Sequence, residues 1–397
     1  MKILRILIVM LCIGWVSVSF ITPHTSTAAT APAYDSLQYF IDRCEAIPVE
    51  MDSTTSHIGQ WQRRIDEEKQ TLELKQTALS KLLTEQSEIL SRKKSTFKKG
   101  RTKKSELARL DTTITNSREA VAQSQRLIAE CTRQQDAQKE ILQKRKQEIT
   151  EVQSRMAYHV THHFGSHAVR YRGMKFLVFT AYTDSHDIRL HLSRSGTPFK
   201  TISSLKKYLE QSKVKPLMIT NAGMFTEAYT PQGLYVEGKG GNYYEIDTGK
   251  ARPNANFYLK PNGVFYIDAA GRAHIDTTEY VARIPKKERK KFRLATQSGP
   301  MLLINGAIHP AFRAESKNLK MRNGVGLIGG NEKCVVFAVT VDESNFYQFA
   351  ALFRDVFGCS NALFLDGNIS AMYLSDIHPD IDGGPFGPMI SVSKKKK

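Results

Sequence analysis

Proline is missing from residues 53 to 160 of this 397-residue chain, and that stretch holds two glycines, Gly59 and Gly100. Because proline and glycine disfavour helix more than any other residues, their scarcity over such a length predicts long helices. Long apolar runs are scarce as well. One uncharged run, Ile6 to Thr22, approaches the length that spans a bilayer, and no later stretch does.

The first residues have the pattern of a secretory signal. Lys2 and Arg5 precede the apolar run, and the small-residue stretch Thr25–Ala31 follows it as a cleavage region would. We therefore expect residues 1–31 to be a signal peptide and the protein to be exported, to the periplasm or another extracytoplasmic compartment. An uncleaved N-terminal membrane anchor is the open alternative, because about 17 apolar residues is the lower limit for a span.

Apolar residues between about 53 and 160 recur in alternating steps of three and four. This repeat predicts an antiparallel coiled-coil hairpin over residues 35–160, with its tip in the basic segment 93–104. Several seam positions of the second half are polar, which indicates that a protein partner or a second copy completes the coiled coil. These polar positions are Ser117, Ser124, Gln135, Gln138 and Arg145.

Cysteine is sparse. Four cysteines follow the expected signal, at positions 44, 131, 334 and 359, and their spacing is not that of a zinc site. An oxidising compartment permits two disulfides. A bridge between Cys44 and Cys131 requires that the helix be interrupted near Pro48 and that the segment before it fold back along the hairpin. A bridge between Cys334 and Cys359 requires neighbouring parallel strands, so the pairing stays open.

Positive charge is concentrated in the second half of the chain. Residues 166–397 contain 32 lysines and arginines against 20 acidic residues, out of a formal net charge of +18. An anionic partner is therefore expected there, and in an envelope that means a phosphate-bearing glycopolymer or glycolipid. Nucleic acid conflicts with export and is not expected as a partner.

Beyond residue 168 the pattern changes to short apolar runs separated by turn residues. Helical patterns are confined to about residues 201–211 and 345–357, so the sequence predicts an α+β domain with mixed β-sheets over residues 168–393. The runs that predict strands are Lys175–Thr180, Pro216–Thr220, Asn256–Leu259, Gly263–Ile267, Cys334–Thr340 and Ala362–Leu365.

Five polar, glycine-bearing motifs lie at the ends of these runs. Each alone is only a turn signal. In sequence they read Asn221-Ala-Gly-Met-Phe225, Pro261-Asn-Gly-Val-Phe265, Gln297-Ser-Gly-Pro-Met301, Arg322-Asn-Gly-Val-Gly326 and Leu365-Asp-Gly-Asn-Ile-Ser370. In this order they resemble the phosphodiester glycosidase family, whose best-known member is the lysosomal uncovering enzyme that removes N-acetylglucosamine from a sugar phosphodiester. The resemblance covers about residues 170–392 and is nearest to a short bacterial envelope branch. Asn368 stands where the family usually carries a second glycine.

The resemblance implies a glycosidase that cleaves a sugar from a sugar-1-phosphodiester in an envelope glycopolymer or glycolipid. Such a reaction needs a carboxylate at the anomeric carbon and donors at the phosphate. We expect Asp366 to be that carboxylate, as nucleophile or as base for water, and Arg322 to hold the phosphate through its planar guanidinium. Asn221 completes the expected catalytic set as a donor.

Further positions in the motifs are expected to bind substrate, either as polar donors or as glycines that allow close backbone approach. They are Gly223, Ser298, Gly299, Asn323, Gly324, Gly367 and Ser370. Glu227 and Asp342 are candidates for a second carboxylate. Neither a metal nor another cofactor is expected. The alternative function is a non-catalytic envelope scaffold or regulator that binds glycan and recruits a partner through its coiled coil.

Overall fold

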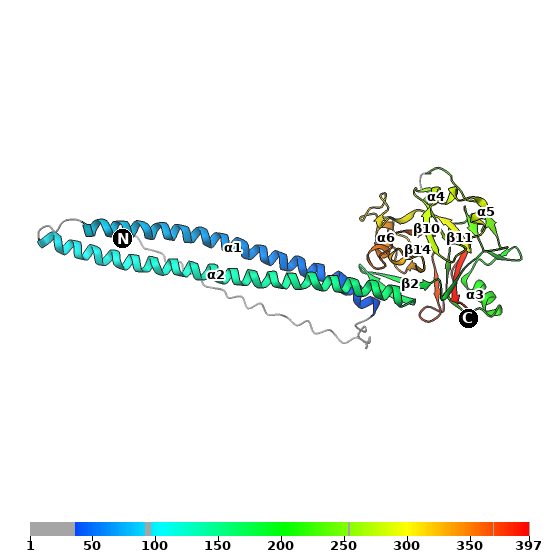
Figure 1. Cartoon of the computed structure of the whole chain (residues 1–397), viewed down its shortest axis with the longest axis horizontal. Coiled ribbons are helices and arrows are strands. Elements are labelled where there is room, and N and C mark those ends of the chain that lie inside the picture. Colours follow the sequence, from blue (N-terminus) through cyan, green and yellow to red (C-terminus); the bar gives the residue numbers. More distant parts are fainter. Residues whose placement is uncertain (1–35, 92–96, 253–254, 368, 397) are drawn as a thin grey trace.

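The computed structural model describes residues 36–91, 97–252, 255–367 and 369–396. Figure 1 shows a long pair of helices that projects from one side of a β-rich domain. The predicted signal peptide and Asn368 lie outside the described residues. Among the described helices, none combines the length and the apolar character that crossing a membrane requires.

Helices α1 (Leu37–Ser91) and α2 (Phe97–His162) form the predicted hairpin. They lie side by side and run in opposite directions (Figure 1). Two of the predicted polar seam residues are buried between them. Gln135 donates from Nε2 to Oε1 of Gln62 at 2.8 Å, and Ser124 accepts from the ammonium of Lys75 at 2.7 Å, so both polar groups are satisfied within the hairpin.

The predicted Cys44–Cys131 disulfide is not formed, because α1 runs through Pro48 without a break. The Gln62–Gln135 contact places Cys131 level with about residue 66, which is roughly 33 Å along the helix axis from Cys44 at 1.5 Å per residue. All four cysteines among the described residues are free.

Three sheets make up most of the β-rich domain, and every pairing between the described strands is antiparallel. The seven-stranded sheet has the order β1 (Gly165–Tyr171), β2 (Met174–Tyr182), β15 (Cys334–Thr340), β14 (Asn323–Leu327), β16 (Ala362–Phe364), β12 (Met301–Ile304), β13 (Ala307–Ile308). The five-stranded sheet has the order β10 (Ala273–Thr277), β9 (Gly263–Ile267), β11 (Leu294–Ser298), β7 (Tyr235–Val236), β8 (Tyr243–Tyr244). The four-stranded sheet has the order β17 (Met372–Leu374), β6 (Pro216–Asn221), β18 (Met389–Lys394), β3 (His186–His191). The hairpin of β4 (Ser193–Arg194) and β5 (Thr197–Pro198) stands apart from these sheets.

Helices cover the outer faces of these sheets. The four helices of the domain are α3 (Ile202–Gln211), α4 (Thr278–Arg283), α5 (Lys286–Arg289) and α6 (Phe346–Asp355). α6 connects β15 to β16, as the predicted crossover requires, but β14 lies between the two strands and separates Cys334 from Cys359. The predicted α+β fold class is confirmed.

One predicted strand is wrong. Residues Asn256–Tyr258 form a single turn of 3-10 helix in place of the expected strand at 256–259. Phe257 and Tyr258 are buried there, so the apolar run is used for packing between loops and not for a sheet ladder.

The base of the hairpin belongs to the same hydrophobic core as the domain. Phe40, Ile41 and Val160 are at most 2% exposed and pack in one cluster with α6 and one face of the seven-stranded sheet. The opposite face of that sheet packs against the four- and five-stranded sheets in a second cluster. The hairpin is therefore anchored in the domain by buried apolar contacts, in addition to hydrogen bonds such as the one from Gln38 to the carbonyl of Arg170.

Candidate active site

The polar motif residues meet where strands of all three sheets end. Asn323, at the start of β14, donates from Nδ2 to the carbonyl oxygen of Asn221 at 2.5 Å, which links the seven-stranded to the four-stranded sheet. Ser298, the last residue of β11, donates from Oγ to the carbonyl of Leu365 at 2.5 Å. Ser370 donates to the carbonyl of Asp366 at 3.0 Å. The structure thus brings six residues of four separate motifs into one hydrogen-bonded group.

Asp366 follows β16 in a half-buried turn. Its Oδ1 accepts a hydrogen bond from the N–H of Gly367 at 2.6 Å, which fixes the orientation of the carboxyl group. Burial raises the pKa of the Asp366 carboxyl to about 6, although that hydrogen bond acts in the opposite direction. A carboxyl group that changes charge near neutral pH is suited to act as a nucleophile or a base.

Two amide groups beside this turn are buried and incompletely paired. Asn221 accepts from the N–H of Ala371 at 3.3 Å, but its Nδ2 has no hydrogen-bond partner among the described residues. Oδ1 of Asn323 is also buried without a hydrogen-bond partner among the described residues. Because an unpaired buried amide costs free energy, such groups are concentrated at sites that bind a further polar molecule. Asn221 therefore retains one donor for a ligand.

Arg322 is 2% exposed and its guanidinium lies against the ring of Phe346, with Cζ 3.7 Å from the ring centroid. Nε donates to the carbonyl of Ser344 at 2.7 Å, and Nη2 donates to the carbonyl of Asn318 at 2.8 Å. Burial lowers the pKa of Arg322 to about 10, so the group remains charged at neutral pH.

No ion pair among the described residues neutralises Arg322, and Nη1 has no hydrogen-bond partner among them. The side chain lines a cavity of about 210 Å³ together with Asn256 and Tyr347. No hydrogen bond or ion pair joins Arg322 to Asp366 among the described residues. The ring centroid of Phe364 lies 5.8 Å from Arg322 Cζ, and Cζ of the same ring lies 3.2 Å from where a Cβ on Gly367 would stand.

Two of the predicted ligand-facing glycines are required by packing. A Cβ at Gly223 would lie 2.5 Å from the carbonyl oxygen of Gln297, and one at Gly299 would lie 2.6 Å from the Cβ of Asn262. Such distances leave no space for a side chain, so glycine there lets two backbone segments approach each other. A Cβ at Gly324 would lie 3.0 Å from the carbonyl oxygen of Leu363 and from Cε1 of Phe349, so this position is closely packed as well.

The two candidate second carboxylates are not part of the group. Asp342 is exposed and its Oδ2 accepts from the N–H of Lys175 at 2.8 Å, which holds the start of β2. Glu227 is exposed in the loop that follows β6. Among the described residues, no cluster of three or more histidine, cysteine or acidic side chains is arranged to hold a metal ion.

Sequence reasoning missed the residues that hold Arg322. Ser344 and Asn318 act through their main-chain carbonyls, and any residue type supplies a carbonyl, so no signal in the sequence marks them. Phe346 offered a weak signal as an aromatic residue at the start of a predicted helix.

Comparison with known proteins shows which family most of this domain resembles. The family model described as phosphodiester glycosidase matches residues 215–392. Over these residues the chain is similar to the phosphodiester glycosidases. This confirms the resemblance carried by the five motifs, and the matched range contains all the predicted site residues.

One curated relative of this domain is the uncharacterized protein YigE of Escherichia coli strain K12, which is 34% identical over 180 residues. That alignment covers 45% of this chain and 66% of the relative, so the chain spans just under two thirds of the relative's length. A solved structure, the catalytic domain of zebrafish N-acetylglucosamine-1-phosphodiester alpha-N-acetylglucosaminidase auto-inhibited by its pro-peptide, is 13% identical. It aligns with a TM-score of 0.41 over 58% of this chain and 82% of that chain.

Proposed function

We propose that the phosphodiester glycosidase-like domain hydrolyses the bond between the anomeric carbon of a sugar and a phosphodiester oxygen. The observation that carries this proposal is the half-buried Asp366 carboxyl, which is oriented by the Gly367 N–H and titrates near pH 6. It lies in one hydrogen-bonded group with Asn221, whose amide keeps an unused donor.

The bond that breaks joins the anomeric carbon to the phosphate oxygen. Its electron pair leaves with the phosphate, which becomes a monoester, while the oxygen of water ends on the sugar. Asp366 acts on the anomeric carbon as nucleophile, or removes the proton from the attacking water as base. Positive character develops on the sugar in the transition state, and an ionised carboxylate stabilises it.

Arg322 is proposed to stabilise the charge on the departing phosphate. Its guanidinium is held by two carbonyls and a ring, so it is pre-positioned and loses little freedom when an anion binds. The cavity beside it contains a second arginine, Arg313, and the hydroxyl of Ser316. This lining suits a phosphate better than a neutral sugar.

The substrate is proposed to be an anionic glycopolymer or glycolipid of the cell envelope, reached after export. The basic surplus of residues 166–397 and the signal-like first residues support this proposal.

The test is incubation of the purified full chain with a panel of sugar-1-phosphodiesters that differ in sugar and in the second phosphate substituent. Release of a reducing sugar together with a phosphomonoester is the expected result. Release of the intact sugar-1-phosphate would show cleavage at the other phosphoester bond and would contradict the proposal.

A non-catalytic scaffold is the second candidate, and the anchored hairpin favours it. Because Phe40 and Val160 share the core of the domain, the two helices extend from it as a fixed arm that suits partner recruitment. A chain that binds these phosphodiesters but leaves the whole panel uncleaved would support this candidate.

A further inference from the structure

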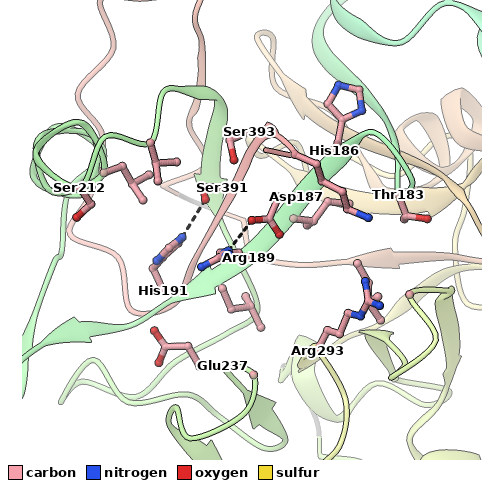
Figure 2. A pocket seen from close by; sticks show the side chains of 18 of the residues that line it. Thr183, His186, Asp187, Arg189, His191, Ser212, Glu237, Arg293, Ser391 and Ser393 are labelled. Carbon is pink, nitrogen blue, oxygen red and sulfur yellow. Dashed lines mark hydrogen bonds and ion pairs between the residues drawn. The ribbon is translucent and has the colours of Figure 1, made fainter. Parts of the chain in front are cut away.

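A groove follows strand β3 at the edge of the four-stranded sheet, and none of the predicted site residues lines it. Its volume is about 530 Å³, within the size range of ligand-binding cavities. It is bordered by the end of α3, the turn after β7 and the C-terminal strand β18. Figure 2 shows His191 and Arg189 projecting from β3 into this region, with Glu237 and Arg293 on the facing segments.

The outer edge of β3 is unpaired. On the inner side, the carbonyl of Ser185 accepts from the N–H of Lys395, which continues β18. On the outer side, the carbonyl of Leu192 accepts from Phe199. Main-chain groups alternate between the two sides along a strand, so those of Ile188 and Leu190 point away from β18. No hydrogen bond among the described residues reaches the outward N–H or carbonyl of either residue.

Among the described residues, the outer edge is occupied by another part of the chain only at Leu192, the residue that follows β3. The outward carbonyl of Leu192 is taken by Phe199, and its N–H interacts with the carboxylate of Glu237. Because Ile188 and Leu190 line the groove, their free donors and acceptors are accessible from it. Two outward residues with free N–H and carbonyl groups are the pattern that an added strand recognises.

The lining of the groove carries more positive than negative side chains. Arg293 and Lys239 are exposed in its lining and form no ion pair among the described residues. Of the two carboxylates in the lining, the first is paired with a cation and the second keeps its negative charge. Asp187 pairs with Arg189 at 2.7 Å, and Glu237 accepts from Asn242 at 2.6 Å.

We propose that the groove beside β3 binds an acidic segment of another protein in extended conformation, as a fifth strand of the four-stranded sheet. Ile188 and Leu190 supply main-chain hydrogen bonds, and Arg293 and Lys239 select acidic side chains. A second copy of this chain is disfavoured, because edge-to-edge pairing would bring two sets of the same cations together. Glycan is disfavoured because it lacks the alternating N–H and carbonyl groups of a strand.

The probe is a pool of seven-residue peptides in which glutamate alternates with randomised apolar residues. Two control pools carry lysine in place of glutamate, or glutamate with every backbone nitrogen methylated. The immobilised full chain should retain the acidic pool at least tenfold better than either control. Amide hydrogen exchange of the free chain should slow at Ile188 and Leu190 when the acidic pool is added.

Variants separate the contribution of charge from that of main-chain hydrogen bonds. Arg293→Glu should lower retention of the acidic pool at least tenfold, whereas Lys207→Glu, the same charge change on an exposed residue of α3 outside the groove, should leave it unchanged. Leu190→Pro removes an outward N–H without removing a bond to β18, but it also removes a side chain that is 2% exposed. A Leu190→Pro variant with native circular dichroism should also lose retention.

Equal retention of the methylated pool would show that charge alone holds the peptide, and would overturn the proposal. Failure to retain the acidic pool above the lysine pool would overturn it as well. Neither readout depends on glycosidase activity, so this inference and the proposed function succeed or fail separately.

Discussion

The main-chain N–H of Asn323 donates to the main-chain carbonyl of Asp366 across 3.0 Å. The side chain of the same asparagine donates to the carbonyl of Asn221. One residue at the start of β14 therefore ties the turn that carries the proposed carboxylate to the end of β6. The relative position of Asp366 and Asn221 depends on this link.

Replacement of Asn323 should loosen the site and the fold together. Asn323→Ala leaves the carbonyl of Asn221 buried without its donor, which costs about 1–3 kcal/mol of unfolding free energy. Urea denaturation measures this loss. Asn116→Ala, at an exposed position on α2, should cost less than about 0.5 kcal/mol. Equal stability of the two variants would contradict the structural role assigned to Asn323.

Arg322 should not tolerate lysine. Arg322→Lys cannot donate to both Ser344 and Asn318 and still present a planar group to an anion, so it should be nearly as defective as Arg322→Ala. Inorganic phosphate should raise the Tm of the parent chain by ligand stabilisation and should not raise that of either variant. A lysine variant with parental kcat/KM would reduce the role of Arg322 to a general positive field.

The rate should depend on pH through Asp366. Burial raises the pKa of this carboxyl to about 6, so it is protonated below that pH and ionised above it. A nucleophile or base must be ionised, and kcat/KM should therefore rise as pH increases through about 6 and then level off. Steady-state rates between pH 4.5 and 8 test this. A rate that falls over the same range would mean that the protonated carboxyl is the active form.

The hairpin base should contribute to the stability of the β-rich domain. Phe40→Ala empties a buried position in the shared core and should cost about 3–5 kcal/mol. Near-ultraviolet circular dichroism during thermal unfolding follows the aromatic side chains, most of which lie in the domain. Leu74→Ala is the matched control, because Leu74 lies on the same helix and is 73% exposed. Domain unfolding at the same temperature in both variants would show that hairpin and domain are independent.

Local patterns in the sequence predicted most of the elements. The heptad steps predicted α1 and α2, and five of the six apolar runs became strands, because hydrophobic periodicity reports which face of an element is buried. Pro48 was expected to interrupt the helix, yet it lies inside α1. Tertiary contacts of the neighbouring Ile47, which is fully buried, override the local preference.

Long-range features could not be read in the same way. Phe40 packs in one core with α6, which lies hundreds of positions later in the sequence. No local pattern encodes such a contact. The anchors of Arg322 are main-chain carbonyls and carry no sequence signal. The open edge of β3 depends on strand order, which the apolar runs did not specify. The motif residues themselves were identifiable because five ordered motifs are far more specific than one.

The most direct test compares Asp366→Asn with the parent chain on any sugar-1-phosphodiester that the parent cleaves. Asparagine keeps the shape of the side chain and its acceptor for the Gly367 N–H, so the fold should be retained while the charge is lost. The control Glu210→Gln removes an exposed carboxylate on α3 and should leave the rate unchanged. The account predicts that kcat for Asp366→Asn falls at least about a hundredfold at pH 7 with native circular dichroism. A folded Asp366→Asn variant that turns over at near-parental rate would contradict it.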